Sequence, residues 1–257
     1  KGGMTIARLL AFGEFPEALT GILSALVKGK YNILISGATN SGKSSLLNAL
    51  AEYIGQEERV ITIEDSAELQ LFHVDNLVRL ETRNANVEGA NEITMQDLIK
   101  ASLRMRPDRI IVGEVRGAEA MSMLQALSTG HSGSFSSIHA NSCRDALRRL
   151  ETMVLMGMDM PLGAIQGLIA SSVDILIHLG RCLNGERKIL EISEIKDYSR
   201  TEYETHTLFQ YDKDHGLEIR EDLFHVEKLK DYGQYEKYCE AVKLFREGRA
   251  EQKKAKA

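Results

Sequence analysis

One stretch near the amino terminus has the residue types and the spacing needed to hold phosphate groups. Residues 37–44 read GATNSGKS, which fits the pattern G-x-x-x-x-G-K-[ST]. Gly37 and Gly42 permit backbone conformations that a side chain opposes, so the N–H groups of the loop can face phosphate oxygens. Lys43 can reach the β- and γ-phosphates, and Ser44 can offer its hydroxyl to Mg²⁺. The predicted nucleotide-binding residues are Gly37, Ala38, Thr39, Asn40, Ser41, Gly42, Lys43, Ser44 and Ser45.

The neighbouring residues are those that a phosphate-binding loop requires. The apolar run 33–35 precedes the loop and predicts a buried strand, and residues 45–51 predict a helix. The positive end of that helix would face the phosphates. A chance Gly/Ser turn with a solvated lysine is the alternative, and the strand before the loop and the helix after it argue against that reading.

Polar side chains follow three further predicted strands, at the points where the strands end. Ligands of open α/β sheets bind at the carboxyl ends of the strands. Taken singly, a carboxylate in such a place is usually a solvated loop residue and a lone histidine is usually structural. Their joint placement near a phosphate loop favours a catalytic role. The three strands 59–63, 109–112 and 134–139 end in these residues: Glu64 and Asp65, Glu114, and His139.

Each of these side chains has a chemical role that suits its type. Glu114 is predicted to polarise the water that attacks the γ-phosphate, as a general base or a water-positioning group. His139 and, less directly, His131 are predicted to sense the γ-phosphate or to stabilise its charge. Glu64 is a further catalytic candidate. Mg²⁺ would be held by phosphate oxygens, by waters and by oxygen atoms of four side chains: Ser44, Glu64, Asp65 and Glu114.

Arginines are frequent in the middle of the chain, and a solvated face or ion pairs account for most of them. Arg79 and Arg83 lie on one face of a predicted strand over residues 76–83, and Arg116 follows Glu114 closely. An arginine can stabilise the charge of a nucleotide that is bound by a neighbouring subunit. These three arginines are therefore our candidates for nucleotide contacts.

The order of the predicted elements indicates an α/β fold. Strands alternate with helices from residue 33 to residue 172, which is typical of a mostly parallel sheet with helices on both faces. Two later strands, over 173–179 and 188–195, flank the turn dipeptide Asn184–Gly185, and a third covers 201–211. We expect these late strands to be antiparallel additions to the sheet.

Composition narrows the class of protein. The 257 residues carry a net charge of −5, which gives no general attraction to nucleic acid, so no nucleic-acid partner is expected. No apolar run approaches the roughly 18 residues that a membrane span needs, so we expect no insertion into a membrane. The three cysteines lie far apart and have neither the spacing of a zinc site nor the even number of a disulfide framework.

Four motifs, in order, resemble those of a known family. Residues 37–44 (GATNSGKS), 62–69 (TIEDSAEL), 105–116 (MRPDRIIVGEVR) and 129–141 (TGHSGSFSSIHAN) resemble the Walker A, Asp box, Walker B and His box of the type II/IV secretion-system ATPases. The residues of these motifs are most similar to those of the tight-adherence (Flp) pilus assembly ATPases, the CpaF/TadA group. One departure is Ser132, where close relatives often carry an acidic residue.

The resemblance implies a RecA-like P-loop NTPase domain that hydrolyses ATP with Mg²⁺ in a homohexameric ring. It also implies a cytoplasmic protein that docks on inner-membrane pilus or secretion platform proteins. On this basis residues 1–30 are expected to be the end of an interdomain linker and a first helix. Residues 31–214 would be the C-terminal ATPase domain, and residues 215–257 a charged helical tail outside the resemblance. The N-terminal domain of the family is expected to be missing.

Three functions are compatible with these residues. The first is an ATPase motor that powers pilus assembly or protein secretion across the bacterial inner membrane. The second is a nucleic-acid translocase or packaging motor on the same RecA-like core, which the acidic net charge disfavours. The third is a nucleotide-dependent regulator that barely hydrolyses, and Glu114 and the His box argue against it.

Overall fold

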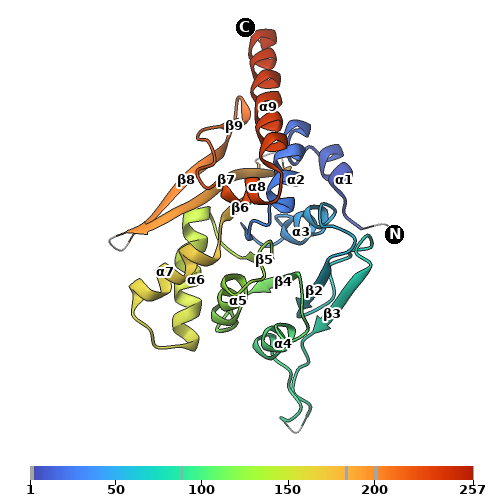
Figure 1. Ribbon diagram of the computed structural model, residues 1–257, viewed down its shortest axis with the longest axis vertical. Coiled ribbons are helices and arrows are strands. Elements are labelled where there is room, and N and C mark those ends of the chain that lie inside the picture. Colours follow the sequence, from blue (N-terminus) through green and yellow to red (C-terminus); the bar gives the residue numbers. More distant parts are fainter. Residues whose placement is uncertain (1–2, 88, 183–184, 200–201, 257) are drawn as a thin grey trace.

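A single nine-stranded sheet runs through the molecule (Figure 1). The structure, a computed structural model, describes residues 3–87, 89–182, 185–199 and 202–256. The order of the strands is β3-β2-β4-β5-β1-β6-β7-β8-β9. Their bounds are β1 Ile33–Gly37, β2 Arg59–Glu64, β3 Asn76–Glu81, β4 Arg109–Val115, β5 Phe135–Ile138, β6 Ile175–Arg181, β7 Arg187–Ser199, β8 Glu202–Asp212 and β9 Gly216–Ile219.

The first six strands are parallel, and the last three, β7 to β9, are antiparallel additions. We expected the strand over 173–179 to be an antiparallel addition as well, but this strand, β6, pairs in parallel with β1 and is antiparallel only to β7. β6 and β7 pair as neighbours, so the expected late hairpin is confirmed, although Asn184 lies outside the described residues. The strand that holds phosphate-loop residue Gly37 lies between β5 and β6. The parallel strands therefore present their carboxyl ends along one edge of the sheet, beside this loop.

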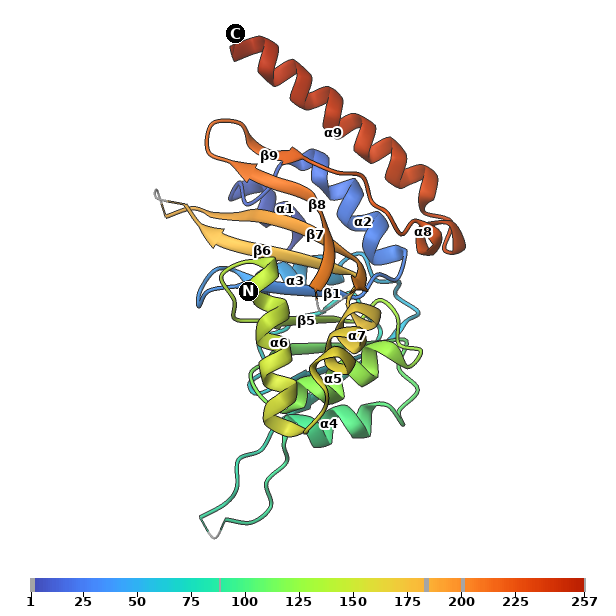
Figure 2. The same ribbon diagram turned by 90° about the vertical axis from the view of Figure 1, so that its left-hand side faces the viewer.

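Helices cover both faces of the sheet, as expected. The helices are α1 Ile6–Ala11, α2 Thr20–Lys28, α3 Lys43–Ala51, α4 Met95–Ser102, α5 Glu119–Ser128, α6 Cys143–Gly157, α7 Leu162–Ser172, α8 Glu227–Asp231 and α9 Tyr235–Lys256. One apolar core joins α1, α2, α3 and α9 to the sheet, and a second joins α4 to α7 to the opposite face. Figure 2 shows α4 to α7 gathered together, away from α1, α2 and α9.

The two cores follow from the alternation of side chains along each strand. In β1, Ile33 and Ile35 belong to the core under α2 and α3, whereas Leu34 belongs to the core under α5 and α6. All three side chains are buried, which explains why a parallel strand reads as a continuous apolar run. Helix starts are also encoded locally: the Thr94 and Asp97 side chains form a capping box at α4.

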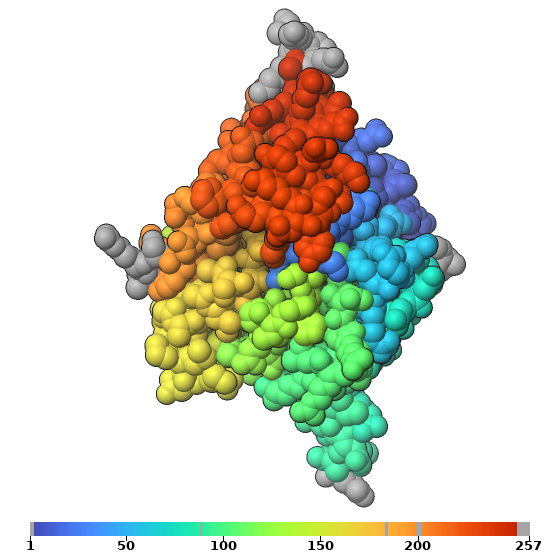
Figure 3. Space-filling view, in the orientation of Figure 1, coloured from blue at the N-terminus to red at the C-terminus, as the bar shows by residue number. Residues whose placement is uncertain are grey.

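The C-terminal helix packs on the body of the protein. Phe245 of α9 is buried and contacts Phe209 of β8 edge to face, with ring centroids 5.2 Å apart. α2 and α9 come so close that a Cβ atom at Gly21 would lie 2.9 Å from the Cβ of Ala241. Figure 3 shows α9 (red) lying against both the late strands and the N-terminal helices. The charged tail is therefore mostly helical from Glu227 onward and partly belongs to the core, but residues 216–219 form strand β9 on β8, so the expectation of a wholly helical tail over 215–257 is wrong.

One expectation about the strand over residues 76–83 needs correction. β3 ends at Glu81, so Arg83 is not on the same strand as Arg79. Beyond the strand, Arg83 forms an isolated antiparallel bridge with Ile93, which closes a protruding loop.

Among the described residues, no helix has the length and apolar character required to cross a membrane.

Candidate functional site

The phosphate-binding loop joins β1 to α3, and its glycines are required by geometry. Gly42 has a φ of 105°, in the left-handed region that disfavours side chains. At Gly37 a Cβ would lie 2.4 Å from the Oγ of Ser41 and 2.7 Å from the backbone oxygen of Leu179. Asn40 also has a positive φ, of 61°. The loop therefore turns tightly before α3 begins at Lys43.

Lys43 points back over the loop. Its Nζ donates hydrogen bonds to the carbonyl oxygens of Gly37, at 3.2 Å, and Ala38, at 3.3 Å. The side chain is buried, and burial lowers the pKa of Lys43, while the Glu114 carboxylate acts in the opposite direction. The ammonium group is thus held in the mouth of the loop by weak neutral acceptors, which phosphate oxygens can replace.

An irregularity in β4 places Glu114. The pairing of β4 with β5 shifts register between Val112 and Val115, so Gly113 and Glu114 form a bulge. Ser137 of β5 fastens this bulge by donating its hydroxyl to the backbone oxygen of Gly113, at 2.6 Å. A bulge re-aims the side chain that it carries, and here it turns Glu114 toward the carboxyl end of β5.

His139 lies between Glu114 and Lys43. Its Nε2 is 2.8 Å from Oε1 of Glu114, within ion-pair distance but without the alignment of a hydrogen bond. Its Nδ1 is 3.4 Å from Nζ of Lys43. Burial lowers the pKa of His139; Glu114 raises it, whereas Lys43 lowers it further. A neutral imidazole that accepts from Lys43 at Nδ1 and carries its proton at Nε2 fits these two neighbours.

The stretch after β2 supplies a residue that the sequence did not single out. Glu68 accepts a hydrogen bond from the hydroxyl of Ser44, at 2.8 Å. Oε1 of Glu64 accepts the backbone N–H groups of Glu68 and Leu69, both at 3.0 Å. Burial raises the pKa of Glu64. Glu64 therefore shapes the loop that carries Glu68, and these contacts favour a positioning role over direct metal binding. The one available signal for Glu68 was its place inside the quoted Asp-box stretch.

The first turn of α3, the stretch after β2 and the bulge in β4 line a pocket of about 160 Å³ beside the phosphate loop. Its lining is rich in oxygen atoms, from Ser44, Glu64, Asp65, Ser66, Glu68 and Glu114, with Arg116 at its rim. Hydroxyl and carboxylate oxygens are the ligands that Mg²⁺ prefers, and Mg²⁺ usually keeps several waters. No three His, Cys, Asp or Glu side chains of the described residues form a metal cluster by themselves. The donor set thus suits a metal ion that is completed by phosphate oxygens and water.

The structure places the three predicted arginines differently. Arg116 is largely exposed and forms ion pairs with Glu114, at 3.2 Å, and Asp65, at 3.4 Å. Arg79 lies on edge strand β3 and is exposed, and Arg83 donates to the backbone oxygen of Asn91 in the protruding loop. Neither is brought to the phosphate loop of its own chain.

His131 is also not brought to this loop. It precedes β5, at the amino edge of the sheet, and its Nδ1 lies 3.3 Å from the backbone oxygen of Ala126. The loop lies at the carboxyl edge of the same sheet. Any contact of His131 with a nucleotide stays a prediction that the geometry of this chain does not favour.

Comparison with known proteins adds a family to this geometry. The chain matches the family described as "Type II/IV secretion system protein" over residues 3–233, beyond Asp214, where we expected the resemblance to end. A putative conjugal transfer protein of Mycobacterium tuberculosis is 39% identical over 192 residues, which cover 74% of this chain and 54% of that protein. The type IV secretion system protein PtlH of Bordetella pertussis is 39% identical over 152 residues, which cover 58% and 45%.

Two solved structures share the fold. The VirB11 ATPase of the Brucella suis type IV secretion system, crystallised with sulphate, superimposes with a TM-score of 0.62 at 34% identity. The match covers 72% of this chain and 54% of that one. The pilus retraction motor PilT with bound ADP has a TM-score of 0.53 at 22% identity and covers 90% and 57%, a likeness of fold alone.

The chain spans about half the length of the curated relatives that it matches. Its family match, in contrast, takes in most of its own length, from the segment before α1 to the turn after α8. The match also contains the phosphate loop, Glu114 and His139. The chain therefore belongs to the type II/IV secretion system protein family.

Proposed function

We propose that this chain is the nucleotide-hydrolysing part of an ATPase motor that drives pilus assembly or protein secretion across the bacterial inner membrane. The observation that carries the proposal is the line of contacts from Lys43 through His139 to Glu114. Nδ1 of His139 is 3.4 Å from the lysine, and Nε2 is 2.8 Å from the glutamate. A phosphate sensor and a water-polarising carboxylate thus stand beside a phosphate loop.

The residues of the chain divide the reaction among them. The loop N–H groups and Lys43 bind the β- and γ-phosphates of ATP and orient the terminal phosphoryl group. Glu114 accepts a hydrogen bond from the attacking water and so directs its lone pair at phosphorus. His139 remains neutral, and its Nε2 faces Oε1 of Glu114 at 2.8 Å, which stabilises that carboxylate electrostatically. Ser44, with Glu68 beside it, would help to hold a Mg²⁺ ion, which would supply positive charge to the phosphates.

The relatives support the biological setting of this proposal. One is named for conjugal transfer, one for type IV secretion, and the solved structure at 34% identity is titled as an ATPase of a type IV secretion system. We propose that the chain acts in a homohexamer, docked on the cytoplasmic side of inner-membrane platform proteins. The residues of its four motifs support assignment to the tight-adherence pilus branch of the family, the CpaF/TadA group.

Nucleotide binding is tested first, by Lys43→Ala. Removal of the ammonium group takes away the main charge that faces the phosphates, so binding of labelled ATP should fall by at least about a hundredfold. Lys28→Ala, on the preceding helix, is the matched control and should bind as the parent chain does. Undiminished ATP binding by the Lys43 variant would contradict the loop assignment.

Hydrolysis is tested by Glu114→Gln. The amide keeps the shape of the side chain but cannot polarise water, so phosphate release should fall by about a hundred- to a thousandfold while ATP binding persists. An unchanged turnover rate would remove the proposed role of Glu114. The assay is run with and without DNA. Strong stimulation by DNA would favour a nucleic-acid translocase over a secretion motor.

A further inference from the structure

A buried carboxyl group lies beside the phosphate loop, next to Gly42. Glu14 follows α1 and is only 3% exposed. Its backbone oxygen accepts the N–H of Ile189 at 3.0 Å, and the neighbouring Gly13 oxygen accepts from Nζ of Lys188 at 2.6 Å. The residues before and at Glu14 are therefore docked on the first residues of β7.

The Glu14 carboxyl group faces the loop itself. A Cβ added at Gly42 would lie 3.6 and 3.7 Å from its two oxygens, and 3.4 Å from Cδ of Arg187. Arg187 in turn donates from Nε to the backbone oxygen of Asn40, at 3.0 Å. Three segments that are distant in sequence thus meet at one point: residues 13–14, residues 40–42 and residues 187–189.

This carboxyl group has no partner of its own. Oε2 of Glu14 is buried without a hydrogen bond, and among the described residues no cation lies within ion-pair distance of it. A buried carboxylate that is left unpaired is costly. Burial accordingly raises the pKa of Glu14, and the positive charges of Arg187 and Lys188 on β7 oppose this shift. The phosphate loop meets this carboxyl group at Gly42, which has no side chain and therefore offers it no charged or polar side-chain partner.

We propose that Glu14 regulates the phosphate loop electrostatically: ionised, it opposes nucleotide binding, and protonated, it allows it. The inference rests on the proposed nucleotide binding of this loop. A negative charge so close to Gly42 repels the phosphates that the loop would hold, and little water screens it because the group is buried. The repulsion is mutual, so a bound nucleotide makes Glu14 harder to ionise.

Proton uptake is the consequence that can be measured. If Glu14 is ionised in the free protein and protonated in the complex, binding takes up a proton, and affinity falls as pH rises. Because the nucleotide has its own ionisation, variants are compared at each pH, which cancels that contribution.

The experiment measures ADP affinity by calorimetry between about pH 5 and pH 9 for three chains: the parent, Glu14→Gln and Glu17→Gln. Glu17 is exposed, lies three residues away and carries the same charge, so it is the matched control. Glu14→Gln should bind ADP roughly three- to tenfold more tightly than the parent at the alkaline end, and equally well at the acid end. Glu17→Gln should follow the parent throughout.

Calorimetry in two buffers with different heats of ionisation gives the number of protons taken up, and this number should be smaller for Glu14→Gln than for the parent. Equal affinity and equal proton uptake in the two chains would overturn the inference, as would weaker binding by Glu14→Gln at every pH. If Glu14→Gln does not fold, absence of proton uptake by the parent chain overturns it instead. A parent chain that binds no ADP would refute the proposed function itself.

Discussion

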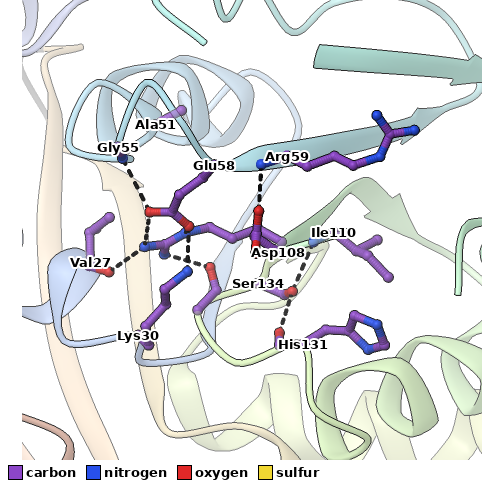
Figure 4. Close-up of polar contacts among 12 residues, drawn as sticks. Val27, Lys30, Ala51, Gly55, Glu58, Arg59, Asp108, Ile110, His131 and Ser134 are labelled. Atoms are coloured by element: carbon purple, nitrogen blue, oxygen red, sulfur yellow. Dashed lines mark hydrogen bonds and ion pairs between the residues drawn. The ribbon is translucent and has the colours of Figure 1, made fainter. Parts of the chain in front are cut away.

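The two edges of the parallel sheet both gather charged side chains, but they treat those charges differently. At the amino edge, Arg109 is fully buried and donates to both carboxylate oxygens of Glu58, at 2.7 and 3.1 Å. It also donates to the backbone oxygens of Gly133, at 2.8 Å, and Val27, at 3.0 Å. Lys30 adds an ion pair to Glu58, and Figure 4 shows Glu58 at the centre of these contacts.

At the carboxyl edge, the charges surround an open pocket and are held loosely. Lys43 has carbonyl acceptors at 3.2 and 3.3 Å, and Arg116 reaches its two carboxylates at 3.2 and 3.4 Å. The Arg116 side chain is 64% exposed, compared with 1% for Arg109. A closed network with short bonds stabilises one conformation, whereas loosely held charges can exchange partners for a ligand. Of two arginines that look alike in the sequence, one supports the fold and the other borders the site.

The sharpest test of this contrast replaces each arginine with methionine. Arg109→Met removes the buried guanidinium that bonds both oxygens of Glu58 and the carbonyls of Gly133 and Val27, and leaves Glu58 with Lys30 alone as its cation, so the free energy of unfolding should fall by about 3–5 kcal/mol. Arg116→Met removes exposed ion pairs and should change it by less than about 1 kcal/mol. Urea unfolding followed by circular dichroism measures both. Similar losses for the two variants would refute the distinction between the two edges.

Acid should weaken the amino edge selectively. Burial raises the pKa of Glu58, but hydrogen bonds and charges from Arg109 and Lys30 outweigh it and lower the pKa to about 2. Because this folded-state pKa lies below the ordinary 4.5, the stabilisation is present above pH 4.5 and is lost as the pH falls toward 2. The shift corresponds to about 3 kcal/mol. In Glu58→Gln this part of the pH dependence of unfolding should disappear, whereas Glu114→Gln should retain it.

A backbone test concerns the turn that receives Arg109. Gly133 has a φ of 83°, and a Cβ there would lie 2.5 Å from Nη1 of Arg109. Gly133→Ala should therefore destabilise the protein by about 2 kcal/mol or more. Gly130 has a φ of 90° with open space around it, so Gly130→Ala isolates the backbone strain and should cost about 1 kcal/mol. Equal effects on thermal unfolding would show that contact with Arg109 is unimportant.

The last test concerns the rate of ATP hydrolysis and the role of His139 at the carboxyl edge of the sheet. His139→Gln should lower the rate of ATP hydrolysis by about tenfold, or about 1.4 kcal/mol, with little change in stability. Since burial holds the pKa of His139 below its ordinary 6.5, the acidic limb of the parent chain's rate profile should have its midpoint below pH 6.5. The glutamine variant should lack this acidic limb. A rate that falls already near pH 7.5 would contradict a neutral His139.

The sequence predicted those parts that depend on local pattern. The strand, loop and helix around Gly37 and Lys43 follow from nearby residues, and parallel pairing brings Glu114 and His139 to the same edge because both close strands. The bulge that aims Glu114 was not predictable, since it depends on how β4 pairs with β5. Glu68 was missed because it lies in an irregular stretch after a strand end, where periodicity carries no information.

Other errors have the same origin in tertiary contacts. Arg83 looked like a continuation of the period-two pattern of Arg79, but its backbone bonds with Ile93 instead of with β2. The sequence analysis did not single out Arg109, because its partners Glu58 and Gly133 are 51 and 24 residues away in the chain. β9 was missed because its four residues pair with β8 only after a turn at positions 213–215.

The close packing of α2 against α9 bears on where this polypeptide can be shortened. Tyr238 and Phe245 fill the same interior as the residues beneath the phosphate loop. A stop codon placed after β8, at the border that motif similarity alone would choose, removes part of that interior and leaves apolar side chains of α2 facing water. Such a shortened polypeptide would be expected to aggregate during expression. The final helix is therefore better regarded as an integral part of this domain, since it covers one side of its apolar core.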